Sequence, residues 1–149
     1  MIKFIATEDT LPLRSSVLRN GEPTTECYFQ ADDLPTTFHL GYHSPVDEIV
    51  SILTCQLESM EPYTGIGYRL RGMATHPEWQ GKGIGTLLLK EVIDHLANEM
   101  KADYLWCNAR RVAHDFYQNL GFEFLSEEFE IPGIGLHRVM YLDLYNKNS

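Results

Sequence analysis

The segment Gly72–Thr86 joins an apolar, strand-like stretch to a run of closely spaced glycines. Gly81, Gly83 and Gly85 alternate with other residues at the point where a helical pattern of apolar residues begins. The start of a helix carries backbone N–H groups without helical acceptors and the positive end of the helix dipole. Glycine leaves room for an anion to reach these N–H groups. The segment is therefore predicted to bind a phosphate or pyrophosphate.

Two well-known phosphate-binding patterns do not fit this segment. A Walker A loop has Ser or Thr after Gly-Lys, whereas Lys82 is followed by Gly83. The dinucleotide fingerprint needs a glycine at its sixth position, and a count that starts at Gly81 reaches Thr86 there. The pattern that fits is Gln-x-x-Gly-x-Gly, beginning at Gln80. A structural alternative is that the glycines only allow tight packing of the strand against the helix.

Hydrophobic periodicity predicts the elements that must position this loop. Gly67–Thr75 alternates like a strand, and from Gly83 to Met100 apolar residues recur with the period of an amphipathic helix. Gly121 stands where a glycine ends a second helix. The expected elements are strand Lys3–Ala6, a helix from Thr7 to Asn20-Gly21, loop Glu22–Pro35, hairpin strands Thr36–His43 and Ile49–Leu57, strand Gly67–Thr75, the helix from Gly83, strand Asp103–Asn108, helix Ala109–Leu120, and strands Phe122–Leu125 and Arg138–Leu144 joined by a turn at Ile131–Gly135.

This order of elements predicts an α/β (α+β) fold in which helices cover one mixed sheet. No internal repeat and no linker divides the 149 residues, so we expect a single domain over residues 1–149. The last residues, 145–149, are expected to form a frayed tail.

Composition excludes several classes of protein. The chain is 44% hydrophobic and 22% charged, as in ordinary globular proteins, and no apolar run is long enough for a membrane span. A formal net charge of −9 argues against nucleic-acid binding and mildly favours a cationic partner such as an amine. Cys27, Cys55 and Cys107 are widely spaced, and there is no Cys-x-x-Cys pair. We expect reduced cysteines, no metal site and a cytoplasmic location.

Two motifs together give the chain a family resemblance. The glycine loop is followed by a strand ending in Asn108 and then by Ala109, Ala113, Phe116-Tyr117 and Leu120-Gly121-Phe122. In this order and separation the motifs resemble those of the GCN5-related N-acetyltransferase family. The resemblance covers about Gly67 to Met140. It implies a mixed, mostly antiparallel sheet flanked by helices, with splayed central strands between which acetyl-CoA binds.

The resemblance also implies which residues bind acetyl-CoA. Backbone of Met73 and Thr75 would pair with the pantetheine arm like an added strand, and the amides from Gly81 to Gly85 would hold the pyrophosphate. Asn108 would bond the pantetheine or a water, unless it only caps its strand, and Lys82 either adds charge near a phosphate or is solvated. The predicted cofactor-binding residues are Met73, Ala74, Thr75, Gln80, Gly81, Lys82, Gly83, Ile84, Gly85, Thr86 and Asn108.

The implied reaction is direct acetyl transfer from acetyl-CoA to a primary amine of a small molecule or peptide. A backbone N–H near Met73 would stabilise the negative charge on the carbonyl oxygen. Tyr117 matches the family tyrosine that protonates the departing thiolate; the alternative is a core aromatic residue. His137 is the candidate general base, and its alternative is a histidine at a strand edge.

Arg14 and Arg19 of the first predicted helix, and Arg71, are candidates for binding an acceptor that bears a carboxylate or phosphate. For the two helix arginines we favour surface salt bridges with Glu8, Asp9 or Glu22. Two alternative functions are a non-catalytic acyl-CoA-binding regulatory module on the same fold and a transferase of a larger acyl group. The acceptor, the acyl preference and the oligomeric state, a homodimer included, are left open.

Overall fold

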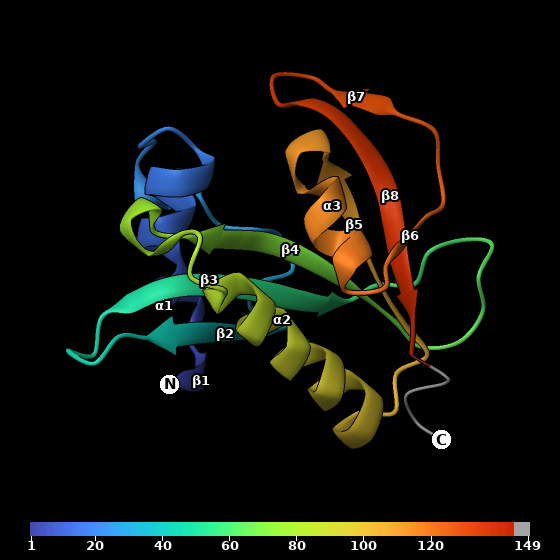
Figure 1. The fold of residues 1–149 in the computed structure, drawn as a ribbon, viewed down its shortest axis with the longest axis horizontal. Helices are drawn as coiled ribbons and strands as arrows, with labels where there is room; N and C mark the ends of the chain where they lie inside the picture. Colours follow the sequence, from blue (N-terminus) through green and yellow to red (C-terminus); the bar gives the residue numbers. More distant parts are fainter. Residues whose placement is uncertain (145–149) are drawn as a thin grey trace. The chain divides into compact units, whose positions relative to one another are not determined.

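The computed structural model of the chain describes residues 1–144 (Figure 1), and the predicted frayed tail at 145–149 lies outside these residues. The strands and helices are, in chain order, β1 (Ile2–Ile5), α1 (Thr7–Leu13), β2 (Phe38–His43), β3 (Ile49–Leu57), β4 (Gly67–Thr75), α2 (Ile84–Asp94), β5 (Tyr104–Arg110), α3 (His114–Asn119), β6 (Glu123–Phe124), β7 (Phe129–Ile131) and β8 (Gly135–Asp143). The strands hydrogen-bond in the order β1-β2-β3-β4-β5-β8-β6, and β7 pairs with β8. The mixed, mostly antiparallel sheet is confirmed.

Two compact units share these elements. The first unit contains Met1–Leu57 and Leu70–Val92, and the second contains Glu58–Arg69 and the described residues from Ile93 to Leu144. Strand β4 and helix α2 each begin in one unit and end in the other. A single domain over the whole chain stays a prediction.

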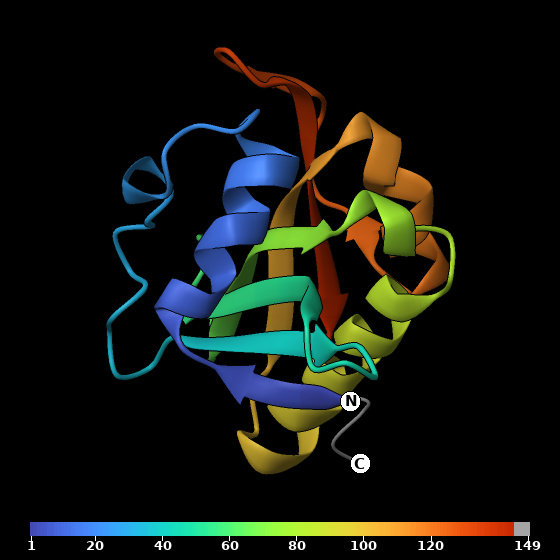
Figure 2. The same cartoon turned by 90° about the vertical axis from the view of Figure 1, so that its left-hand side faces the viewer.

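The first unit is built on the predicted β-hairpin. Strands β2 and β3 pair antiparallel, with Phe38 opposite Cys55, and β1 pairs antiparallel with the other edge of β2. Residues 50–56 of β3 are all buried, which is the pattern of a strand covered on both faces. Helix α1 lies along β3 and β4 (Figure 2), where Leu13 packs against Ile52 and Ala74.

The two long predicted helices form largely as expected. Helix α1 continues as a π-helical turn at Arg14–Leu18, and the chain leaves it through positive φ angles at Asn20 and Gly21. In α2, Leu88, Leu89 and Val92 are completely buried, whereas the neighbouring polar residues face solvent. A π-helical turn at His95–Glu99 extends α2. The amphipathic pattern from Gly83 is confirmed.

The second unit is organised around β5. This strand pairs parallel with the first residues of β4, from Gly67↔Tyr104 to Arg69↔Trp106. Its other edge pairs antiparallel with β8 over its whole length, from Tyr104↔Asp143 to Arg110↔His137. Helix α3 follows β5 through a 3-10 turn at Arg111–Ala113.

Two expectations in this unit are wrong. The second helix begins at His114, not Ala109, because Ala109 belongs to β5, where it pairs with Arg138 and is 2% exposed. Strand β7 was not predicted, and the last strand begins at Gly135, because backbone pairing such as Phe129↔His137 extends the hairpin beyond the apolar pattern. The glycine at the end of the helix, Gly121, has the expected left-handed φ of +96°.

The three cysteines are buried free thiols, as expected. Between residues 1 and 144, no helix is long and apolar enough to cross a membrane.

Candidate active site

The glycine loop connects a 3-10 turn at Pro77–Trp79 to α2, within the first unit. Gly81 and Gly83 have φ angles of +77° and +78°, in the left-handed region that favours glycine. A Cβ atom built on either residue would meet no heavy atom within 4 Å. At Gly67, by contrast, a Cβ would collide with the Tyr104 ring. Tight packing therefore does not explain Gly81 and Gly83; their backbone conformation does.

The loop ends where the hydrogen bonding of α2 begins. The Leu87 N–H donates to the carbonyl of Gly83 over 3.1 Å. The N–H groups of the first turn have no acceptor inside the helix, and the helix dipole adds positive potential at this end. Lys82 is exposed, and its Nζ lies 5.1 Å from the centroid of the Trp79 ring. This end of α2 is open and electropositive in character.

Gln80 fastens the loop to the end of β4. Its Nε2 donates to the carbonyl of Thr75 over 2.9 Å, and the Thr75 hydroxyl lies 2.8 Å from the Ser51 hydroxyl. Ala74 is buried against Leu13. Because side chains alternate along a strand, Met73 and Thr75 project to the face opposite Ala74. The predicted residues from Met73 to Thr86 thus form one continuous strand-loop-helix segment.

Tyr117 lies on α3 in the second unit and is 8% exposed. Its ring packs against Phe116 and Phe122, with centroids 5.2 Å away in each case. Its hydroxyl is hydrogen-bonded to the thiol of Cys107 on β5. Burial raises the pKa of this thiol to about 12, although the Tyr117 bond and the charge of Arg69 act in the opposite direction.

His137 lies near the start of β8 and is buried. Its Nδ1 is 2.8 Å from the carbonyl oxygen of Gly135. A carbonyl oxygen only accepts hydrogen bonds, so Nδ1 carries the proton and Nε2 of the neutral ring has a free lone pair. Asn108 of β5 pairs with Val139 of β8, so Asn108 and His137 are two register positions apart on neighbouring strands.

A buried charge cluster in the first unit was not predicted. Arg14 donates to Asp32 through Nη1 over 2.7 Å and through Nη2 over 2.9 Å, and the two side chains are 1% and 2% exposed. The expectation of a surface salt bridge is therefore wrong for Arg14. It is confirmed for Arg19, which pairs with Glu22 over 2.9 Å.

A chain of hydrogen bonds extends this cluster. Arg14 Nη2 donates to the Thr54 hydroxyl over 2.8 Å, and Thr54 Oγ1 lies 2.7 Å from Nδ1 of His39. Nε2 of His39 lies 3.1 Å from the Thr7 hydroxyl, which donates to Asp33 over 2.9 Å. Burial, followed by the charge of Arg14, lowers the pKa of His39 against the opposing effect of Asp32 and Asp33.

The same cluster fixes an aromatic ring against β4. The Phe29 ring centroid lies 3.7 Å from the guanidinium carbon of Arg14 and 4.1 Å from that of Arg71. A Cβ on Gly72, whose φ is +61°, would come within 2.8 Å of Phe29. Phe29 therefore packs directly beside the residue that precedes Met73. Periodicity could not reveal this contact, because Phe29 lies in the polar loop at 22–35.

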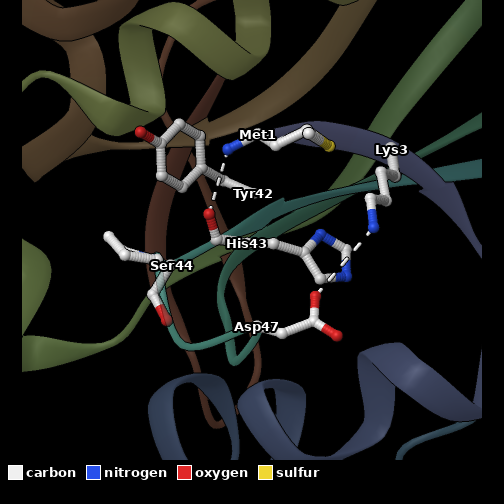
Figure 3. Close-up of a pocket in the computed structure, with 7 residues that line it drawn as sticks. Met1, Lys3, Tyr42, His43, Ser44 and Asp47 are labelled. Atoms are coloured by element: carbon white, nitrogen blue, oxygen red, sulfur yellow. Dashed lines mark hydrogen bonds and ion pairs between the residues drawn. The ribbon is translucent and has the colours of Figure 1, made fainter.

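A cavity of about 320 Å³ lies elsewhere in the first unit (Figure 3). It is lined by Met1, Lys3, Tyr42, His43, Ser44, Pro45 and Asp47, and none of the predicted site residues contributes to it. Lys3 and Asp47 form an ion pair of 3.9 Å there. In the described part of the chain, no three His, Cys, Asp or Glu side chains are grouped to hold a metal ion.

Comparison with known proteins gives the family. A family model described as an acetyltransferase (GNAT) domain matches residues 36–142. An N-acetyltransferase of Bacillus subtilis (strain 168), YitI, whose activity is uncharacterized, is 36% identical over 144 residues, which are 96% of this chain and 95% of that protein. The chain belongs to the GNAT family of acetyltransferases, as the two sequence motifs predicted.

Solved structures share the fold at low sequence identity. The ribosomal-protein-S18-alanine N-acetyltransferase of Escherichia coli has a TM-score of 0.74 and 19% identity, over 97% of this chain and 93% of that chain. An aminoglycoside 6'-N-acetyltransferase complexed with coenzyme A has a TM-score of 0.70 and 13% identity, over 97% of each chain.

Proposed function

We propose that this chain transfers an acetyl group from acetyl-CoA to a primary amine of a small molecule or peptide by direct attack. The observation that carries the proposal is the glycine loop before α2. Gly81 and Gly83 adopt left-handed conformations, and the space beside each α-carbon is open. A loop of this kind at a helix start fits a pyrophosphate.

The segment before α2 provides the groups that acetyl-CoA binding needs. Amides of Gly81, Lys82, Gly83, Ile84 and Gly85, with Thr86, would hold the pyrophosphate, and Lys82 would add a positive charge. Backbone of Met73 and Thr75 would pair with the pantetheine arm, with the Asn108 side chain as a further polar partner. Gln80 would act indirectly, because its amide already bonds Thr75.

Acetyl-CoA, when bound, supplies the activated thioester carbonyl that the amine attacks. The chain supplies three groups for this step. The N–H of Met73 would stabilise negative charge on the carbonyl oxygen. Nε2 of His137, whose Nδ1 donates to Gly135, would take the proton that the amine loses. The Tyr117 hydroxyl would protonate the departing thiolate.

The cellular location and the oligomeric state of the chain are part of the same proposal. Three buried free thiols suit the reducing cytoplasm, and a homodimer is compatible with the sequence. A net charge of −9 favours a cationic acceptor over a nucleic acid.

An acceptor screen tests this function. The purified chain is incubated with acetyl-CoA and a broad panel of primary amines, and released CoA is measured with a thiol reagent. We expect amine-dependent release of CoA and an acetylated amine by mass spectrometry. If the chain binds acetyl-CoA but leaves it intact with every amine, the regulatory-module alternative replaces the proposal. Faster turnover of succinyl-CoA or a longer acyl-CoA would favour the larger acyl group.

A further inference from the structure

Two consecutive residues of β4 contact one aromatic ring. In a regular strand, neighbouring side chains project to opposite faces, so one ring could not meet both of them. Here the guanidinium carbon of Arg71 lies 4.1 Å from the centroid of the Phe29 ring, and a Cβ on Gly72 would lie 2.8 Å from Cε2 of that ring. The left-handed φ of +61° at Gly72 accounts for this departure from alternation.

The backbone conformation of Gly72 sets the direction of the next N–H group. A peptide group is planar, so the peptide plane that joins Gly72 to Met73 turns with the backbone angles of Gly72. The N–H of Met73 is the group proposed above to stabilise negative charge on the thioester carbonyl oxygen. A displacement of about 1 Å at a reacting centre can lower a rate about 100-fold. Whatever holds Gly72 in place therefore bears on the rate of acetyl transfer.

A buried ion pair holds Phe29 in its loop. The N–H of Phe29 donates to Oδ2 of Asp32 over 2.7 Å, and its carbonyl accepts from the N–H of Asp32 over 3.1 Å. Asp32 also accepts two hydrogen bonds from Arg14, over 2.7 and 2.9 Å. Arg14 further donates to the carbonyl of Cys27 over 3.1 Å and to the hydroxyl of Thr54 over 2.8 Å. The loop around Phe29 is thus fastened to the helical turn that follows α1 and to β3.

Arg14 also lies against the Phe29 ring and against Gly72. Its guanidinium carbon is 3.7 Å from the ring centroid, and its Nε is 3.3 Å from the position of a Cβ on Gly72. This Nε is buried and has no hydrogen-bond partner among residues 1–144, which costs stability. Apolar side chains that replace a buried ion pair are often as stabilising as the pair or more so. Stability alone therefore does not account for Arg14, whereas a fixed position for Phe29 does.

We propose that Phe29 is a positioning residue for the oxyanion donor of the acetyl transfer. With Arg14 and Arg71 on its ring, Phe29 packs against Gly72, maintains the left-handed bend of β4 and thereby aims the Met73 N–H at the thioester carbonyl. Phe29 acts through the backbone of β4 and takes no part in proton transfer. The inference rests on the proposed function, because that function gives the Met73 N–H its role.

Phe29→Leu tests the proposal, because leucine keeps an apolar side chain but removes the flat ring. Infrared difference spectroscopy follows the isotope-labelled carbonyl of bound acetyl-CoA, and kcat is measured with the amine found in the acceptor screen. A hydrogen bond to the carbonyl oxygen weakens the C=O bond and lowers its stretching frequency. The matched control is Phe124→Leu, because Phe124 of β6 is also half-buried, with the Arg138 guanidinium carbon 3.6 Å from its ring centroid.

In the wild-type complex we expect a lower carbonyl frequency than that of acetyl-CoA in buffer. Phe29→Leu should move the frequency back toward its value in buffer and lower kcat about tenfold, with the KM for acetyl-CoA unchanged. Because Phe29 is only half-buried, this variant should stay folded. Phe124→Leu should keep the wild-type frequency and kcat even if its melting temperature falls.

A double-mutant cycle tests the contact between the ring and Gly72, and it needs no acceptor. Gly72→Ala, Phe29→Leu and the double variant are compared with the wild-type chain by thermal unfolding. Leucine ends before Cε2 and Cζ, the ring atoms that a Cβ on Gly72 would meet. Gly72→Ala should therefore lower the melting temperature less in the Phe29→Leu background than in the wild-type background. Equal losses in both backgrounds would overturn the contact.

The infrared measurement separates failure of this inference from failure of the proposed function. A wild-type carbonyl frequency and kcat in Phe29→Leu would overturn the positioning role and leave only packing. If the wild-type complex itself shows no shift from the frequency in buffer, the Met73 N–H is not the donor. That result would contradict the oxyanion assignment in the proposed function, and the positioning role of Phe29 would fall with it.

Discussion

Replacing Gly83 by leucine tests whether the loop before α2 binds the pyrophosphate. Gly83 has a φ of +78°, so a residue with a Cβ costs about 1–2 kcal/mol of folding free energy there. The new Cβ atom itself meets no heavy atom within 4 Å, so the expected cost comes from the backbone conformation. The free energy of unfolding of a domain of this size is about 5–15 kcal/mol, so the variant should stay folded. Its melting temperature should fall by about 2–8 °C.

The effect on CoA binding should be much larger than the effect on stability. A leucine side chain would occupy the space in which the pyrophosphate must approach the amides. We expect the Kd for CoA, measured by calorimetry, to rise at least tenfold, or about 1.4 kcal/mol.

Gly133→Leu is the matched control for this experiment. Gly133 has a φ of +79° and equally open surroundings, but it lies in the turn between β7 and β8. Its variant should lose similar stability and keep the wild-type Kd for CoA. Wild-type CoA affinity in Gly83→Leu, together with a melting temperature matching that of the control, would refute the pyrophosphate assignment.

Three further predictions concern the acid and the buried cluster. Tyr117→Phe should lower kcat about 100-fold with little change in the KM for acetyl-CoA; a KM effect alone in steady-state kinetics would count against the acid role. Arg14→Ala leaves Asp32 buried without its cation and should cost about 3–5 kcal/mol in urea unfolding, and a loss below about 1 kcal/mol would contradict the buried pair. The pKa of His39 is lowered below 6.5 in the folded state, so the unfolded chain binds a proton at His39 more readily than the folded chain. The free energy of unfolding should therefore fall as the pH drops below about 6.5, by at most about 1.4 kcal/mol per pH unit. His39→Gln should flatten that dependence in urea titrations, and an unchanged slope would exclude His39 as its source.

Hydrophobic patterns in the sequence were sufficient to predict most elements of the first unit and helix α2. The change of period at Gly83 marks the start of α2 because one face of that helix is completely buried. Ala109 misled the prediction for a different reason. It fits the helical spacing of Phe116 and Tyr117, yet it lies on β5, since one small apolar residue suits either period. Strand β7 is only three residues long, too short for a periodic signal, and its backbone pairing with β8 defines it.

Candidate site residues were predictable where backbone conformation requires a particular residue. Glycine occurs at positions 81 and 83 because the loop has left-handed φ angles there, which favour glycine. The partners of Arg14 were not predictable, because Asp32 lies in an irregular loop 18 residues away and no periodic signal links them. Likewise, nothing in the spacing of Cys107 and Tyr117 indicates that their side chains are hydrogen-bonded.

A crystal structure of the chain with CoA tests the central claim most directly. We expect the diphosphate of CoA to lie on the main-chain N–H groups of residues 81–86, with the pantetheine arm beside the backbone of Met73 and Thr75. Density for CoA at another surface, with the N–H groups of Gly81 and Gly83 making no contact to it, would contradict pyrophosphate binding by this loop.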